Sequence, residues 1–206
     1  MAFYDKINDI SNFVISFSAN PQQDFGVFAK GYSKAAHVLA ESLLAKQRFS
    51  DYEAYPVVFL YRHSFELYLK SFYYKAVLIS AFKNIQSIDN FVQHHKLTLL
   101  AQVFKKICRV LFPSDKSLLK IADKVNRFAA DFEQIDFDSF AYRYPIDKQG
   151  NASAKHHQVV NLFAFHQAMQ ELLNDLEVVD FGLNLEADQA QEIYEVIQET
   201  QSIITS

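Results

Sequence analysis

The chain has 206 residues and a net charge of −4, half of its residues are hydrophobic, and its single cysteine is Cys108. This length and composition allow one domain with a sizeable core, while 4 Gly and 4 Pro are too few for a many-stranded β fold. The acidic balance excludes a protein that binds nucleic acid with its whole surface, although it permits a local basic face. One cysteine excludes an internal disulfide and a Cys-rich zinc site.

The first residues, Met-Ala-Phe-Tyr-Asp-Lys, lack the basic-then-apolar order of a secretory signal. No apolar run approaches the roughly 18 residues that a membrane-spanning helix needs. We therefore expect a cytoplasmic protein with no membrane partner. Cys108 lies in a helical pattern, which predicts a buried and inert thiol.

Apolar residues spaced three and four positions apart predict amphipathic helices along most of the chain. Pro21 and Pro113 separate neighbouring helices, and Gly182 is predicted to end another. Short connections between long helices favour antiparallel packing. The predicted helices cover about 3–18, 24–46, 56–82, 96–111, 114–135, 157–180 and 187–204.

Individual residues refine these boundaries. Ser50 to Glu53 has the pattern of a capping box, but Pro56 would then lie uncomfortably deep in the helix. We therefore expect a short turn at 50–54 and a helix that begins near Pro56. Ser114 is the predicted cap of the helix that follows it.

Within the helix at 24–46, Gly31 and a run of alanines predict the close approach of a neighbouring helix. His37 lies off the main apolar face and is expected at the surface. Further along, large residues alternate after position 137 and a Gly-containing turn follows, which predicts a short extended segment or β-hairpin near 137–151. The predicted fold is one all-α domain, an antiparallel up-and-down helical bundle with its core at about 24–180 and an acidic C-terminal helix at 186–206.

The stretch from Val57 to Lys70 is apolar almost all the way round a helix, as in a buried helix. Arg62, Glu66 and Lys70 nevertheless recur every four residues and share one helix face, with His63 beside them. Buried charges are costly unless they are paired. This polar seam therefore needs partners from elsewhere in the chain or a solvated cleft, and it is the first candidate functional site.

Charge is unevenly distributed. Lysine and arginine concentrate between positions 96 and 127, whereas none follows Lys155 and acidic residues dominate the remainder. One interpretation is solvated helix faces that attract each other within the fold or across a dimer. The other is a basic surface for nucleic-acid phosphates.

Three segments in the same order resemble a group of prokaryotic HEPN-like proteins. Residues 62–70 are similar to the Arg-His-x-x-Glu-x-x-x-Lys helix of that group, and His95-Lys96-Leu97 is similar to its His-Lys-Leu. Residues 136–150 resemble its Asp-x-Asp-x-Phe-x-Phe-Arg-Tyr-Pro-x-Asp-x-x-Gly segment. The resemblance extends over about residues 25–180.

The resemblance implies a helical bundle, often dimeric, of a kind found in toxin–antitoxin, abortive-infection and RNA-processing systems. Many HEPN proteins are metal-independent endoribonucleases with an Arg-x4–6-His motif, whose site forms across the dimer. No arginine of this chain is followed by histidine at that spacing. The implied partners are a second copy of the chain, RNA or a nucleotide, and a cognate antitoxin or regulatory protein.

Metal-independent RNA cleavage needs a base for the 2′-hydroxyl proton and cations for the phosphate charge. His63 or His95 could supply the base, and Arg62, Arg143 and Lys70 could hold the phosphate. Glu66 could orient a cation or raise the pKa of the histidine. The candidate catalytic residues are His63, His95, Arg62, Glu66 and Arg143, and the candidate ligand-binding residues are Lys70, Lys96, Tyr144 and Asp147.

Three alternatives remain open at this point. Arg62, Glu66, Arg143 and Asp147 could form a buried ion-pair network that ties the extended segment to the central helix. The chain could be a non-catalytic interaction or regulatory module that uses its acidic C-terminal helix. It could also be a small-molecule enzyme with a pocket over the seam.

Two adjacent histidine pairs, at 94–95 and 156–157, do not predict a metal site, because neighbouring residues of a regular element point apart. The sequence holds no phosphate-binding Gly-rich loop, zinc-binding His-Glu-x-x-His motif or nucleophile elbow. We therefore expect neither a metal nor a cofactor.

Overall fold

The computed structural model describes residues 24–46, 48–85, 95–135, 149–150 and 159–204, and its elements there are all helical. The expected helix at 3–18 lies outside the described residues, and so does the segment near 137–151 apart from Gln149 and Gly150. The all-α class is confirmed. The five helices are α1 (Phe25–Leu44), α2 (Asp51–Phe82), α3 (Leu97–Leu111), α4 (Lys116–Ile135) and α5 (Leu162–Ile204).

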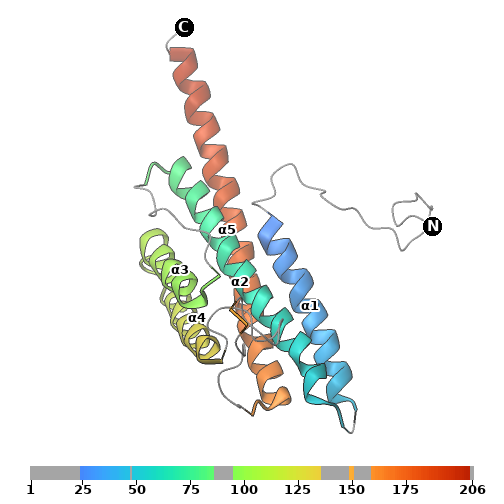
Figure 1. Cartoon of the computed structure of the whole chain (residues 1–206). Coiled ribbons are helices and arrows are strands. Elements are labelled where there is room, and N and C mark those ends of the chain that lie inside the picture. Colours follow the sequence, from blue (N-terminus) through green and yellow to red (C-terminus); the bar gives the residue numbers. More distant parts are fainter. Residues whose placement is uncertain (1–23, 47, 86–94, 136–148, 151–158, 205–206) are drawn as a thin grey trace, which may run out of the picture.

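Helix α2 is the centre of the bundle, and α1, α3 and α5 all pack against it (Figure 1). Contacts between Phe25 and Tyr74 and between Tyr32 and His63 show that α1 runs antiparallel to α2. Helices α3 and α4 form a second antiparallel pair. Antiparallel packing is therefore confirmed for both short-connected pairs.

Strict up-and-down alternation does not hold between the two pairs. Arg62 of α2 contacts His95 just before α3, and Phe72 packs on Phe104 further along both helices. The two helices therefore run parallel. This arrangement brings the start of α3 beside the middle of α2, where the polar seam lies.

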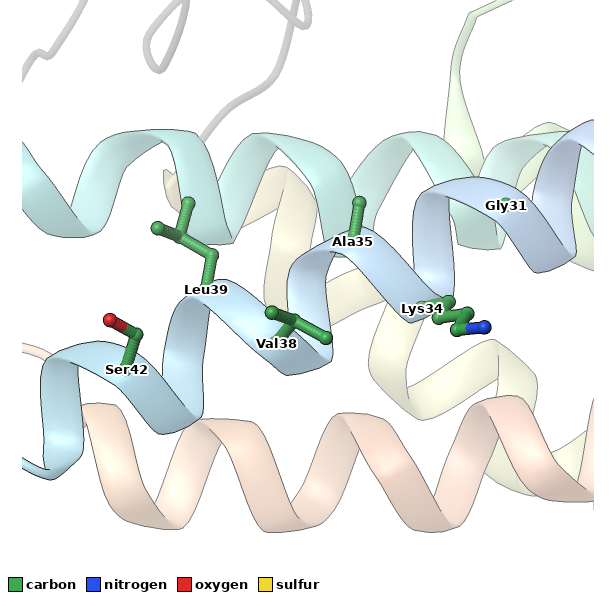
Figure 2. A pocket seen from close by; sticks show the side chains of 6 residues that line it. All are labelled: Gly31, Lys34, Ala35, Val38, Leu39 and Ser42. Carbon is green, nitrogen blue, oxygen red and sulfur yellow. The ribbon is translucent and has the colours of Figure 1, made fainter. Parts of the chain in front are cut away.

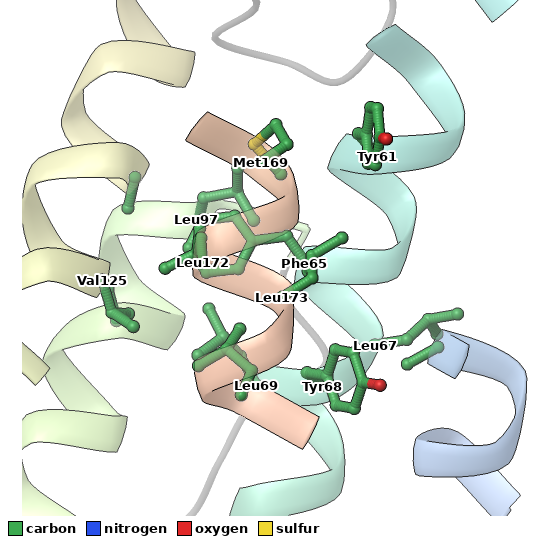
Figure 3. Packing of buried hydrophobic residues seen from close by; sticks show 14 of the residues in the cluster. Tyr61, Phe65, Leu67, Tyr68, Leu69, Leu97, Val125, Met169, Leu172 and Leu173 are labelled. Carbon is green, nitrogen blue, oxygen red and sulfur yellow. The ribbon is translucent and has the colours of Figure 1, made fainter. Parts of the chain in front are cut away.

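The main core is a cluster of buried apolar side chains to which all five helices contribute, and a small second cluster joins Ala76 of α2 to Ile107 of α3. Tyr61, Phe65 and Phe72 of α2 are inaccessible to solvent. Figure 3 shows Phe65 and the aliphatic side chains of α5, among them Leu172, meeting at the centre. Burying a large apolar side chain contributes roughly 1.5–3 kcal/mol, so these aromatic residues hold α2 in place.

The N-terminus of α2 corrects the expectation of a turn at 50–54. Ser50 and Glu53 occupy the positions of a capping box, the Ser50 backbone N–H donates to the Glu53 carboxylate at 2.8 Å, and α2 begins at Asp51. Pro56 therefore lies within the helix. The carbonyl that loses its helical partner there belongs to Tyr52, an exposed residue of the first turn, and the cap determines the start of the helix.

The cap of α4 is also one residue later than expected. The Leu118 N–H donates to the Asp115 carboxylate at 2.9 Å, so Asp115 and not Ser114 caps the helix. A carboxylate in this position also interacts favourably with the positive end of the helix dipole.

Helix α5 does not end at Gly182, which overturns the prediction of two separate C-terminal helices. Glycine costs a helix only about 1 kcal/mol relative to alanine. Contacts further along offset that cost: Leu183 and Ala190 are buried, and Phe82 of α2 packs on Tyr194. Although α5 is long, neither it nor any other described helix is apolar enough over its length to cross a membrane.

Cys108 is buried in α3, as expected. Burial raises the pKa of its thiol to about 12. Because the thiolate is the reactive form, this thiol is not a nucleophile at neutral pH.

The close helix approach predicted at Gly31 and the alanines is confirmed at Ala29, Ala36 and Ala40, which are fully buried, but the glycine that takes part is Gly26 and not Gly31. Gly31 is exposed with nothing near the position of a β-carbon, whereas a β-carbon on Gly26 would lie 2.5 Å from Oδ2 of Asp180. The Asp180 carboxylate cannot move away freely, because Ser71 and Lys75 both bind its Oδ1. The first turn of α1 therefore packs directly on a charged group of α5.

Gly26→Ala is expected to lower the free energy of unfolding by about 1–3 kcal/mol, because the added methyl group overpacks this contact. Gly31→Ala is the matched control on the same helix and should raise that energy by about 0.5–1 kcal/mol, the usual gain in a helix interior. Urea denaturation of both variants measures the difference. Equal stabilisation by the two substitutions would show that α1 and α5 do not meet at Gly26.

Candidate functional site

The polar seam of α2 forms a cluster with the residue before α3. Arg62, Glu66 and Lys70 lie one turn apart on one face of α2, and His95 joins them across the contact between the two helices. We call these four residues the Glu66 cluster. Most residues of α2 between Tyr61 and Phe72 are buried in the bundle, so the charged side chains of this stretch lie deep in the fold as well.

Glu66 is the centre of the cluster. Its Oε1 accepts hydrogen bonds from Nζ of Lys70 and from Nδ1 of His95, each at 2.7 Å. Its Oε2 accepts one from Nη1 of Arg62 at 3.1 Å. The Glu66 and Arg62 side chains are 2% and 3% exposed and that of Lys70 is 11% exposed, so three charged groups share a site almost closed to water.

The electrostatics favour an ionised Glu66. Burial by itself would raise the pKa of this carboxyl, but Lys70, Arg62 and His95 outweigh burial and hold the pKa below its ordinary value. Two cations surround one carboxylate, so the cluster carries a net positive charge even when His95 is neutral.

His95 is the accessible member of the cluster, with a side chain 70% exposed. Its backbone carbonyl accepts a hydrogen bond from Nη2 of Arg62 at 3.1 Å, which fixes the main chain, while Glu66 fixes the ring. A carboxylate that accepts from Nδ1–H selects the tautomer whose Nε2 carries a lone pair. The arrangement therefore presents an oriented imidazole base to solvent.

The structure separates His63 from this cluster. Its ring packs edge-on against Tyr32 of α1 at 4.6 Å and is stacked on Phe59 at 5.5 Å. His63 therefore lies on the side of α2 that faces α1, whereas Glu66 and His95 meet on the side that faces α3. The two histidines are not brought together.

Lys96 follows His95 directly and occupies the N-cap position of α3, half-buried. Arg143, Tyr144 and Asp147 lie outside the described residues. The buried pairing of Arg62 with Glu66 agrees with part of the ion-pair network considered above, and the half that would include Arg143 and Asp147 stays a prediction.

Two further clusters were not predicted from the sequence. In the first, Asp180 of α5 binds Ser71 at 2.8 Å and Lys75, both of α2. Ser71 and Lys75 share a face four residues apart, but nothing in the sequence indicates that their partner lies about a hundred residues later. The acidic residues of α5 in fact pair repeatedly within the fold, including Asp175 with Lys124 of α4.

In the second cluster, His37 and Glu41 of α1 meet His166 of α5. His37 is half-buried and its ring is stacked on that of His166 at 5.3 Å, so the expectation of a surface histidine was wrong. The spacing of four between His37 and Glu41 is a weak sequence signal for a shared face, and only the packing of α1 on α5 adds His166.

One depression lies along α1 and not over the polar seam. It is an open groove of about 550 Å³ along α1, shown in Figure 2, and it has one charged side chain and little polar chemistry to orient a substrate. The idea of a small-molecule pocket over the seam therefore gains no support from it. The groove is lined by Gly31, Lys34, Ala35, Val38, Leu39 and Ser42.

Comparison of the chain with protein-family models, with characterised proteins and with solved structures gave no significant match.

Proposed function

We propose that this chain is a HEPN-like protein that binds RNA and cleaves it without metal, with His95 as the general base. The observation that supports the proposal is the 2.7 Å hydrogen bond from an exposed His95 to a buried, ionised Glu66. A buried carboxylate that holds an imidazole in one tautomer and orientation is the arrangement by which catalytic triads position their histidine base.

In the proposed reaction, Nε2 of His95 accepts the proton of a ribose 2′-hydroxyl. The 2′-oxygen then attacks the adjacent phosphorus and the 5′-oxygen leaves with a proton from water, which gives a cyclic phosphate and a 5′-hydroxyl. Glu66 stabilises the imidazolium that forms, and Arg62 and Lys70 keep Glu66 ionised. Glu66 is thus a positioning residue.

Burial refines the roles expected for the cations. Arg62 and Lys70 are almost closed to solvent and engaged with Glu66, so they support the base and do not hold the phosphate. The positive charge of the cluster still attracts a polyanion. Direct phosphate contacts fall to Lys96, and by the resemblance to Arg143, with Tyr144 and Asp147 as further ligand-binding candidates.

His95→Ala is expected to lower the rate of RNA cleavage by roughly 10²–10⁴-fold, the usual contribution of a general base. The assay uses tag-free protein, single-stranded RNA and EDTA, with Glu171→Gln on the exposed side of α5 as the control. Because the His95 side chain is 70% exposed, circular dichroism should show an unchanged fold. Loss of cleavage in His63→Ala with full activity in His95→Ala would overturn the assignment of the base.

A second candidate is a non-catalytic interaction module, and the end of α5 favours it. This part of α5 extends beyond the other helices (Figure 1) and exposes Ile193, Val196 and Ile197 at 60%, 61% and 47%. Exposed apolar residues in a row are typical of a surface that another helix covers. Two results together would favour this second function. The wild-type protein would form a dimer that Ile193→Asp disrupts, and it would neither bind nor cleave RNA.

A further inference from the structure

A group of metal-ligating side chains lies between α1 and α5, apart from the Glu66 cluster. His37 and Glu41 project from successive turns of α1, and His166 projects from α5. One ligand atom from each of the three residues lies within 4.8 Å of the other two. Nε2 of His166 lies 3.7 Å from Oε1 of Glu41.

His166 has the surroundings of a metal ligand. Its side chain is 4% exposed, and its Nδ1 is 2.6 Å from the hydroxyl of buried Tyr61. Metal-binding histidines commonly have their second ring nitrogen held in this way, which fixes the ring and the tautomer. If Nδ1–H donates to Tyr61, Nε2 carries the lone pair and faces Glu41. Burial, and then the neighbouring His37, lower the pKa of His166 below its ordinary value of 6.5.

His37 is held in a comparable way, because its Nδ1 is 2.8 Å from the side-chain amide of Gln170. An amide offers both a donor and an acceptor, so Gln170 can orient the ring in either tautomer. Glu41 is the adjustable member, since its side chain is 62% exposed. Ligands of a tetrahedral zinc ion lie roughly 3.4 Å apart, which is shorter than the 4.8 Å within which the three donor atoms lie, so metal binding requires side-chain rotation, for which exposed Glu41 has room.

The space beside these residues is open. Glu41 and His166 line a depression of about 420 Å³ together with Gln167 and Gln170, whose side chains are polar. Two histidines and one glutamate leave a fourth position of a tetrahedral ion for water or a ligand. Such a set of nitrogen and oxygen donors suits Zn²⁺ and related divalent transition metals better than Mg²⁺ or Ca²⁺.

We propose that His37, Glu41 and His166 bind one divalent transition-metal ion, of which Zn²⁺ is the best fit, with a water molecule in the open position. The site is built by the packing of α1 on α5 and is independent of the RNA-cleavage proposal, whose histidine lies before α3. A bound ion would also join the two helices and stabilise the fold by mass action.

The test is equilibrium dialysis of the tag-free, full-length protein with Zn²⁺, followed by thermal unfolding with and without the metal. We expect one Zn²⁺ per chain and a rise in the unfolding midpoint. His37→Ala and Glu41→Gln should each weaken binding at least about 10–100-fold and remove the rise. Substitution of Co²⁺ for Zn²⁺ should add visible absorption bands that both variants lack.

His95→Ala and Glu171→Gln are the matched controls, because they remove a histidine and a glutamate outside the cluster. Both should keep the stoichiometry and the midpoint shift of the wild type. His37 and Glu41 are not fully buried, so their variants should fold, which circular dichroism checks. Absence of Zn²⁺ binding, or binding that survives both His37→Ala and Glu41→Gln, would overturn the proposal.

Discussion

Replacing Glu66 with glutamine is expected to lower the free energy of unfolding by about 3–5 kcal/mol, the usual cost of breaking a buried ion pair from one side. The variant has nearly the same shape as the wild type but leaves the charges of Arg62 and Lys70 without their carboxylate. Both side chains are nearly closed to water, so solvent cannot replace the lost partner. Urea denaturation followed by circular dichroism measures the change.

The control is Asp123→Asn, which removes one carboxylate from the ion pair between Asp123 of α4 and Lys105 of α3. That pair is 54% and 32% exposed, and surface pairs typically contribute about 0–1 kcal/mol. A comparable small effect for Glu66→Gln would mean that the Glu66 cluster is hydrated in solution and that the described geometry does not persist.

The pH dependence of stability follows from the same group. The pKa of Glu66 is lower in the fold than its ordinary value of 4.5, so ionised Glu66 stabilises the fold above about pH 4.5. This contribution is lost as the pH falls through the folded-state pKa. The decline in the free energy of unfolding between pH 5 and the acid transition should therefore be shallower in Glu66→Gln than in the wild type.

Asp180→Asn is the second substitution with a large expected effect, about 3–5 kcal/mol of lost stability. The amide can still accept from Ser71, but Lys75, with a side chain 8% exposed, loses its counter-charge. Burial already lowers the pKa of Lys75 against the opposing effect of Asp180. Removal of the carboxylate therefore leaves the lysine either charged in an apolar site or forced to release its proton.

A double variant separates charge from packing. Lys75→Met in the Asp180→Asn background removes the stranded cation and should recover most of the lost stability, since buried pairs are often replaceable by apolar groups. Glu186→Gln is the control on the same helix, because its pair with Lys83 is partly exposed and should contribute no more than about 1 kcal/mol. Failure of the double variant to recover stability would contradict the proposed cause.

Much of the helical layout could be predicted from the sequence. The boundaries of α1, α3 and the end of α2 follow apolar periodicity, which is a local property. Two predicted helix boundaries were wrong because another interaction opposed the local sequence signal. At the start of α2 the capping box outweighed Pro56. At Gly182 the contacts with α2 keep α5 helical. Propensity is a weak signal that tertiary packing overrides.

By itself the sequence determined the position of the polar seam, because the spacing of Arg62, Glu66 and Lys70 on an apolar helix is a property of one segment. It also singled out His95 by resemblance. Only the tertiary structure decided that His95 meets Glu66 and that His63 faces α1. It alone placed His166 beside His37, 129 positions away in the chain. The partners of a buried polar group depend on which helices pack together, and the periodicity within one helix carries no information about that packing.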